Sequence, residues 1–272
     1  MKRFKCLIPL ILILSLLCPP AFAAKSKIED TTIPPREVPG EVIQDVPVLI
    51  QHLLDLAYSE MIETDGRELK KKNKYTKWRN NYEYGWCGGF ITYCMLQLDI
   101  PQQTHTKIKE GEVDGIVHVK EAGVGKLYTG YEKMNRVTRI PQKGFIAVYG
   151  NTDKKFAGVT GFYHVGLVWD VELLPDGKYR ITTIEGNVGS KADETHKKAS
   201  HTVVMYVRDY DPNTEKKQDD LSLVPEEERD REENSLFSYD YTYGNKTLYI
   251  NCFLMPWVPG DPTLIYAEEE TP

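Results

Sequence analysis

A cysteine lies where a helix is predicted to begin. Cys87 follows the turn-forming residues Tyr84–Trp86, and apolar residues recur behind it at helical spacing until Pro101 ends the pattern. The free N–H groups of a first helical turn stabilise an anion, so they lower the pKa of a thiol placed there. Gly88 and Gly89 leave open backbone where a substrate carbonyl can approach the sulfur. The pattern predicts a nucleophile; the alternative is a buried structural cysteine.

A predicted β-hairpin brings a histidine close to two groups that can orient it. Leu174–Lys178 contains Pro and Gly in a turn-forming order, and an antiparallel register about this turn places His164 opposite 185–187. Strand alternation puts Glu185 and Asn187 on one face. One ring nitrogen of His164 can then take the thiol proton while the other donates to Glu185 or Asn187. Nucleophile, base and orienting group are the parts of covalent catalysis, whereas a lone strand histidine is usually a core residue.

Helices precede strands along the chain, which predicts an α+β fold in which N-terminal helices pack on an antiparallel sheet. Asp45 is the predicted N-cap of a first helix, with Pro47 in its first turn and an end near Asp65-Gly66. Residues 102–140 lack a strong period and are interpreted as a long, partly helical excursion. Alternating patterns predict strands at 145–149, 163–171, 179–184, 201–207 and 248–254.

The N-terminus resembles a cleavable secretory signal. Three cations precede an apolar run over 7–17, and Ala21-Phe22-Ala23 offers small residues to a signal peptidase. The run is shorter than the roughly 20 residues of a membrane-spanning helix, although a retained anchor is the alternative. We therefore expect a signal peptide over 1–23, an extracytoplasmic protein of the cell envelope, and no stable membrane insertion after cleavage.

The rest of the chain is long enough for one substantial domain. We expect a linker over 24–44, a catalytic domain over 45–260 and an acidic tail over 261–272. The charged stretch 209–235 is interpreted as a solvated insertion, with a functional arm as the alternative. The net charge of −6 argues against nucleic acid as a partner, because nucleic-acid binding depends on clustered Lys and Arg. We expect a monomer.

Cysteines and histidines outside the proposed pair have plainer interpretations. Without the signal peptide, Cys87, Cys94 and Cys252 remain. A Cys94–Cys252 disulfide would leave only Cys87 free; the alternative is that Cys94 packs in the core. His196 and His201 lack a neighbouring Cys or carboxylate cluster, so a polar loop is favoured over a metal pair. His52 is predicted on the first helix, at its surface or in the core.

Four stretches together resemble one family. Residues 86–94 read Trp-Cys-Gly-Gly-Phe-Ile-Thr-Tyr-Cys and resemble the signature of CHAP domains, the cysteine, histidine-dependent amidohydrolase/peptidases within the papain-like hydrolases. Stretches 73–78, 163–168 and 181–187 are similar to the same family, in the same order. The resemblance covers about 49–190 and resumes near 248–256. Two departures are Gly144-Phe145, where the family usually has Gly-Asp, and a long spacer before His164.

The resemblance implies a papain-like fold with Cys87 as nucleophile, His164 as base, and Glu185 and Asn187 as orienting groups. It implies peptidoglycan or its stem peptides as substrate, cleaved as an N-acetylmuramoyl-L-alanine amidase or as an endopeptidase, without a metal or organic cofactor. Residues expected to line the substrate cleft are Trp86, Tyr84, Gly88 and Trp78. The alternatives are a catalytically silent wall-binding or partner-binding protein on this fold, and a cysteine amidase acting on a non-wall peptide.

Overall fold

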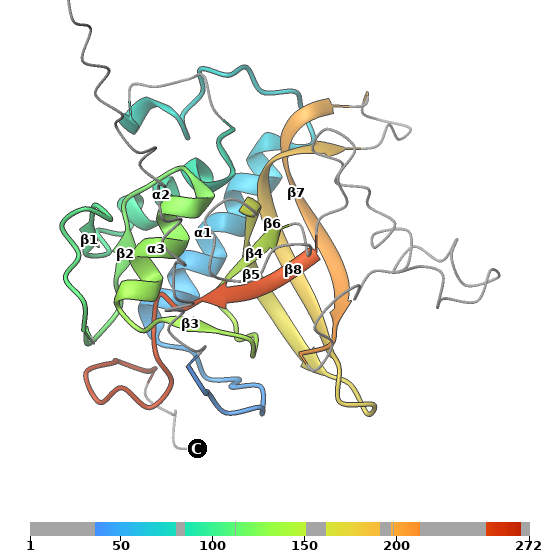
Figure 1. Cartoon of the computed structure of the whole chain (residues 1–272). Coiled ribbons are helices and arrows are strands. Elements are labelled where there is room, and N and C mark those ends of the chain that lie inside the picture. Colours follow the sequence, from blue (N-terminus) through green and yellow to red (C-terminus); the bar gives the residue numbers. More distant parts are fainter. Residues whose placement is uncertain are drawn as a thin grey trace, which may run out of the picture. The chain divides into compact units, whose positions relative to one another are not determined.

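Six antiparallel strands form the main sheet, in the order β3-β8-β4-β5-β6-β7 (Figure 1). The strands are β3 Val137–Thr138, β4 Ile146–Gly150, β5 Phe162–Leu173, β6 Tyr179–Ser190, β7 Ala199–Tyr210 and β8 Tyr249–Leu254. The computed structural model describes residues 36–79, 85–111, 113–150, 162–190, 197, 199–212 and 249–267, all within one compact unit, Thr32–Pro272. The α+β prediction is therefore confirmed.

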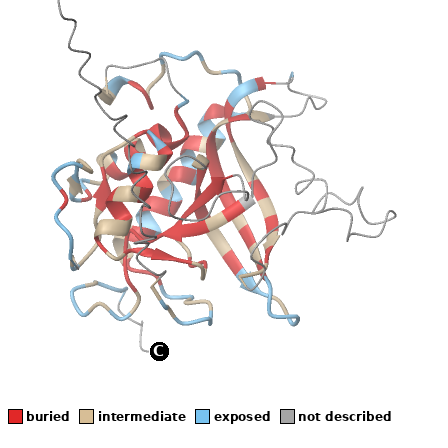
Figure 2. Ribbon diagram, viewed as in Figure 1, coloured by how far each residue is buried: buried red, intermediate tan, exposed pale blue. Residues whose placement is uncertain are grey.

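Three helices lie on one side of this sheet (Figure 1). They are α1 Val48–Thr64, α2 Cys87–Gln97 and α3 Val124–Lys133. The 3₁₀ helix η1 covers Lys77–Arg79, and β1 Gln102–Gln103 pairs in parallel with β2 His118–Val119. Buried residues concentrate where the helices face the sheet (Figure 2).

Helix α1 follows its predicted apolar pattern but begins differently. Its buried residues include Ile50, Leu53, Leu54 and Ala57 at helical spacing. The N-cap is Pro47 rather than Asp45, and the Pro47 carbonyl accepts the first helical hydrogen bonds. The helix ends as predicted, where Asp65 and Gly66 take positive φ angles of 51° and 63°.

A buried arginine, Arg136, anchors the segment 102–140 to the end of the sheet. Arg136 donates to the carbonyls of Gly115 and Pro256, each at 2.8 Å, and to that of Val113. Since Pro256 follows β8, one side chain joins the excursion to the end of the sheet. Residues 102–140 thus hold α3 and three short strands within a fixed structure.

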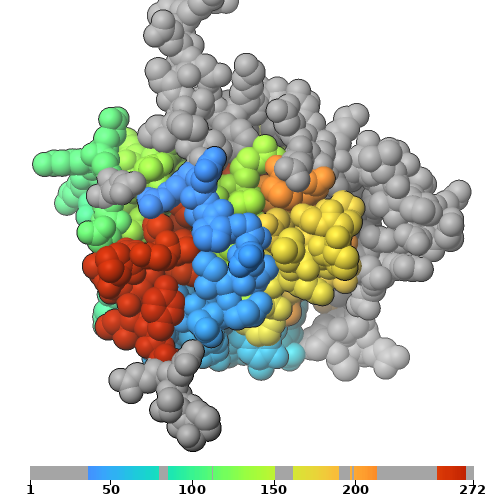
Figure 3. All heavy atoms as spheres, turned by 90° about the horizontal axis from the view of Figure 1, so that it is seen from below, coloured from blue at the N-terminus to red at the C-terminus, as the bar shows by residue number. Residues whose placement is uncertain are grey.

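Parts of the expected linker and tail belong to the folded unit. Tyr179 Oη donates to the Gly40 carbonyl at 2.6 Å, and the Ile43 N–H donates to Gln142 Oε1 at 2.9 Å. At the other end, the Val48 N–H donates to the Ile265 carbonyl at 2.9 Å. Figure 3 shows these N-terminal (blue) and C-terminal (red) residues side by side. The domain therefore extends beyond 45–260 in both directions.

Some expectations concern residues outside the described ranges. These are the signal peptide, the first part of the linker (24–35), most of the charged insertion (213–235), Tyr84, His196 and the last residues of the tail (268–272). None of the helices in the described part of the chain has the length and apolar character that crossing a membrane requires.

Cys94 and Cys252 do not form a disulfide, so of the two alternatives the packing of Cys94 in the core is the one that the structure shows. Both thiols are free and fully buried. They lie in different parts of the core, because the charged groups near Cys94 are Glu60 and Lys74, whereas Cys252 neighbours a separate pair, Glu132 and Arg139. Burial raises the pKa of both thiols well above the ordinary range, so both are core residues.

Gly144 has a steric reason to be glycine. Its φ is +79°, and a Cβ there would lie 2.3 Å from Ile50 Cγ2 on α1. The next residue, Phe145, is buried against Trp257, with ring centroids 5.6 Å apart. The Gly-Phe pair that departs from the family pattern is therefore part of the core between α1 and β4.

We expect Gly144→Ala to lower the free energy of unfolding by about 2–4 kcal/mol, because it combines an unfavourable φ with overpacking. Urea denaturation followed by circular dichroism measures the change. Gly177→Ala is the matched control: its φ is +83° but nothing lies within 4 Å of the added methyl group. Equal losses in both variants would show that contact with Ile50 is unimportant.

Candidate active site

Cys87 is the first residue of α2, as predicted. Only 5% of its surface is exposed, and the N–H groups of Gly88 and Val165 donate hydrogen bonds to its sulfur. One donor belongs to the first turn of the helix and the other to β5, so helix and sheet both stabilise a negative charge at this point.

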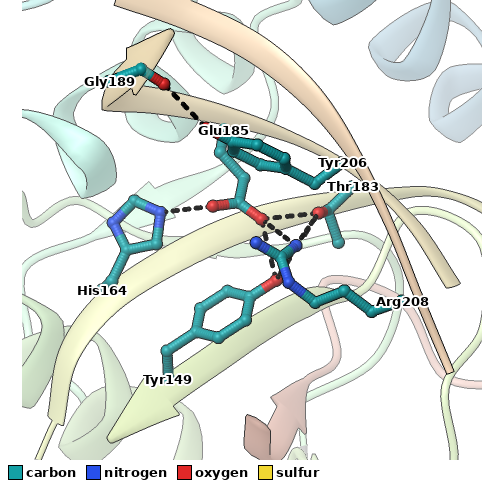
Figure 4. Close-up of polar contacts among 7 residues, drawn as sticks. All are labelled: Tyr149, His164, Thr183, Glu185, Gly189, Tyr206 and Arg208. Carbon is teal, nitrogen blue, oxygen red and sulfur yellow. Dashed lines mark hydrogen bonds and ion pairs between the residues drawn. The ribbon is translucent and has the colours of Figure 1, made fainter. Parts of the chain in front are cut away.

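His164 and Glu185 converge on this sulfur from adjacent strands. His164 Nε2 donates to Glu185 Oε2 at 2.7 Å, and both side chains are buried (Figure 4). The imidazole also lies close enough to the Cys87 sulfur for each group to favour the charged form of the other. Since Nε2 faces Glu185, Nδ1 is the ring nitrogen available to the sulfur. The structure thus brings three of the predicted site residues into one chain of contacts.

The three groups shift one another's proton affinities. Burial opposes ionisation of the Cys87 thiol, but the hydrogen bond and charge of His164 outweigh it and lower the Cys87 pKa. Burial alone would lower the pKa of His164, yet hydrogen bonds to Cys87 and Glu185 raise it to about 9. Burial disfavours the Glu185 carboxylate, but Arg208 and His164 lower its pKa to about 2. The three contacts therefore favour the charged forms of all three groups together: thiolate, imidazolium and carboxylate.

A glycine makes room for the carboxylate. A Cβ on Gly166 of β5 would lie 2.7 Å from Glu185 Cγ and 3.3 Å from its Oε1. Gly166 stands two residues from His164, so the missing side chain leaves space through which Glu185 of β6 reaches the imidazole. Contacts this short cannot persist without movement of Glu185.

We expect Gly166→Ala to slow alkylation of Cys87 by iodoacetamide about tenfold at pH 6, because a displaced Glu185 no longer supports the imidazolium. The rate is measured by mass spectrometry of the peptide that contains Cys87. Gly123→Ala is the control, since nothing lies within 4 Å of the methyl group that it adds. An unchanged rate in Gly166→Ala would mean that the position of Glu185 does not affect the thiol.

Asn187 does not share the site of Glu185. Its Oδ1 hydrogen-bonds His201 Nδ1 at 3.1 Å, and its Nδ2 faces Gly85. The pairing of β6 with β7 shifts between Gly186 and Val188, and Asn187 has a φ of 64°. This irregularity breaks the alternation that was expected to put Glu185 and Asn187 on one face. Of the two predicted orienting groups, Glu185 is therefore the one that contacts His164, and Asn187 lies beside the segment before Cys87.

Three of the residues expected to line a cleft, Trp86, Gly88 and Trp78, make contacts around the start of α2. Trp86 is 2% exposed and stacks on Tyr75 at 5.2 Å. Gly88 is buried, and a Cβ there would lie 2.5 Å from the Ala122 carbonyl oxygen, so packing explains this glycine. Trp78 is half-buried, with Nε1 donating to the Gly89 carbonyl at 3.3 Å. Trp86 and Gly88 thus make packing contacts, and their role in binding substrate stays a prediction.

Three residues that hold Glu185 were missed by the sequence interpretation. Thr183 Oγ1 and Tyr149 Oη donate to Glu185 Oε1 at 2.6 and 2.9 Å, and Arg208 Nη1 lies 2.5 Å from the same oxygen (Figure 4). Thr183 stands two residues before Glu185, so strand alternation alone signals it. Tyr149 and Arg208 come from β4 and β7, and the sequence does not indicate how these strands pair with β5 and β6.

Two surface pockets lie elsewhere. A pocket of about 450 Å³ is lined by His52, Thr263 and the apolar residues at 48–49, 101, 116 and 264–265. Another, of about 220 Å³, is lined by residues at 36, 113–114 and 258–262. Neither includes Cys87. In the described ranges, no three His, Cys, Asp or Glu side chains gather where they could hold a metal ion.

A thiolate beside an imidazolium, with N–H donors at a helix start, has the parts needed for acyl transfer. The thiolate can attack a carbonyl carbon, and the imidazolium can protonate a leaving amine. The first-turn N–H groups are available to stabilise developing negative charge. Comparison with protein-family models, with curated proteins and with solved structures finds no match for this chain.

Proposed function

We propose that this protein is an exported cysteine hydrolase that cleaves an amide bond in peptidoglycan. The observation that carries the proposal is the buried series Cys87–His164–Glu185, in which a thiol at a helix start contacts an imidazole that a carboxylate orients. A merely structural cysteine has a raised pKa, as Cys94 and Cys252 do, whereas that of Cys87 is lowered.

The mechanism is acyl transfer in two halves. The Cys87 thiolate attacks the amide carbonyl, and a thioester forms as the C–N bond breaks. His164 gives its Nδ1 proton to the leaving amine, and then takes a proton from the water that hydrolyses the thioester. Glu185 keeps the imidazole in one tautomer and one orientation through both halves.

The papain-like fold and the wall substrate belong to the same proposal. Helices that precede an antiparallel sheet, with the cysteine at a helix start and the histidine on a strand, are compatible with the fold that the CHAP resemblance implies. Peptidoglycan as the substrate follows from that resemblance. Cleavage between sugar and stem peptide and cleavage within the peptide both fit it.

Digestion of purified peptidoglycan, with mass spectrometry of the products, tests the proposal. Release of intact stem peptides identifies an amidase, whereas new amines within the peptide identify an endopeptidase. No product from walls of several cross-link types, given a folded protein with a reactive Cys87, would exclude peptidoglycan. Binding to the wall without products would favour a catalytically silent wall protein.

A further inference from the structure

Arg208 is a buried cation on the strand next to Glu185. It belongs to β7, which pairs with β6, and only 7% of it is exposed. Its guanidinium lies against the rings of Tyr149 and Tyr206, 4.9 and 4.7 Å from their centroids. The Tyr206 hydroxyl donates to the Gly189 carbonyl at 2.7 Å, which fixes that ring (Figure 4). The guanidinium is thus held between two rings, and its position is restricted.

The two carboxylate oxygens of Glu185 contact two different cationic side chains. Oε2 accepts from His164, and Oε1 accepts from Arg208 Nη1 at 2.5 Å. The same Nη1 lies 2.9 Å from Thr183 Oγ1 and 3.0 Å from Tyr149 Oη. Each carboxylate oxygen therefore has its own cationic partner, and rotation of the carboxylate would break both contacts.

Stability alone does not account for such a pair. Two charges taken out of water lose hydration that their attraction often fails to recover, so buried ion pairs are weak stabilisers. The same two strands also carry an ordinary surface ion pair, in which Arg180 Nε lies 2.9 Å from Asp209 Oδ1. There the side chains of Arg180 and Asp209 are 40% and 33% exposed. Arg208 differs from Arg180 in being buried against a carboxylate that contacts His164.

We propose that Arg208 is a positioning residue that holds Glu185 ionised and oriented, and that through Glu185 and His164 it sets the pH at which Cys87 becomes a thiolate. The inference rests on the proposed function, because it gives Arg208 a role in activating the same nucleophile. Arg208 acts through Glu185 and is not a group that contacts the substrate.

The groups that face this carboxylate come from every element packed around it. The groups in direct contact with it are His164 from β5, Tyr149 from β4, Thr183 from β6 and Arg208 from β7. Cys87 of α2 lies on the other side of the imidazole, and its sulfur also interacts with the charge of Arg79. Loss of a buried cation from such a cluster favours the protonated form of each acid in it. Removing the charge of Arg208 should therefore move thiolate formation to higher pH.

The test is the pH dependence of Cys87 alkylation in the full chain, for wild type, Arg208→Gln, Arg208→Lys and Arg180→Gln. Gln keeps hydrogen-bonding atoms but removes the charge. We expect its alkylation midpoint to rise by about one pH unit, which is about tenfold slower alkylation below the wild-type midpoint. Arg208→Lys, which keeps the charge, should recover most of the shift. Arg180→Gln should match wild type.

A folded Arg208→Gln protein with the wild-type profile would overturn the proposal. If Arg208→Gln does not fold, Arg208→Lys decides: a midpoint within about 0.3 units of wild type supports a role of the charge, and an upward shift of about a full unit contradicts it. The wild type separates this failure from failure of the proposed function. An ordinary thiol profile in wild type, with a midpoint near pH 8.5, would contradict the nucleophile itself.

Discussion

Cys87→Ala should abolish hydrolysis of peptidoglycan, with a loss of at least about 10,000-fold in kcat. In the proposed mechanism the sulfur is the atom that attacks, and alanine has no atom that can form the thioester. Product release per unit time, measured by chromatography of wall digests, gives the loss. The variant should remain folded, because it exchanges one small buried side chain for another at the start of α2.

The matched control for Cys87→Ala is Cys94→Ala. Cys94 lies on the same helix and is also a buried free thiol, but its pKa is raised by burial. We expect its removal to cost some stability and to change kcat less than threefold. Equal losses in the two variants would mean that helix packing, and not the Cys87 sulfur, limits the reaction.

Glu185→Gln should lower kcat/KM by up to about 10,000-fold, the size of the loss in kcat when the aspartate of a Ser-His-Asp triad is neutralised. Glutamine has one oxygen for two cations, so its amide N–H₂ must face either Arg208 or His164. In either case the imidazolium loses a charged partner, and the pKa of His164 falls. Rates from pH 5 to 10 should show the alkaline limb, which belongs to the imidazolium, moved to lower pH.

The same carboxylate predicts a pH dependence of stability. The folded pKa of Glu185 is about 2, below its ordinary value of 4.5. Its contribution to stability is therefore fully present above pH 4.5 and is lost as the pH falls toward 2. In Glu185→Gln that part of the acid transition should disappear.

Glu172→Gln is the control for both experiments on Glu185. Glu172 stands on β5, is exposed, and pairs in register with Arg180. It should leave the pH–rate profile and the acid transition unchanged. A Glu185→Gln protein with wild-type kcat/KM would show that His164 needs no charged partner.

Local sequence patterns were enough to predict the elements that hold the site. The apolar spacing of α1 and α2 is a property of each helix alone, and Cys87 stands at the predicted helix start. The turn Leu174–Lys178 gave a register near the observed one, in which Leu167 pairs with Ile184. Because the register of a hairpin depends on its short local turn, the contact between His164 and Glu185 could be predicted from the sequence.

Features that depend on contacts between distant segments were not predictable in this way. The irregularity at Asn187 depends on how β6 pairs with β7, and alternation along one strand does not reveal it. Arg208 lies on a strand whose register with β6 cannot be read from the chain. The residues near Gly40 are anchored by side chains about 100 or more residues away, Gln142 and Tyr179, so composition alone suggested a linker.

Trapping the acyl-enzyme tests the central claim most directly. Wall fragments are mixed with the protein, and the reaction is quenched with acid within milliseconds to seconds. The masses of the peptides that contain Cys87, Cys94 and Cys252 are then measured by mass spectrometry. We predict a thioester on Cys87 alone, sensitive to neutral hydroxylamine and absent from Cys87→Ala. Cleavage products that accumulate with no adduct on Cys87, and that persist in Cys87→Ala, would contradict a cysteine nucleophile.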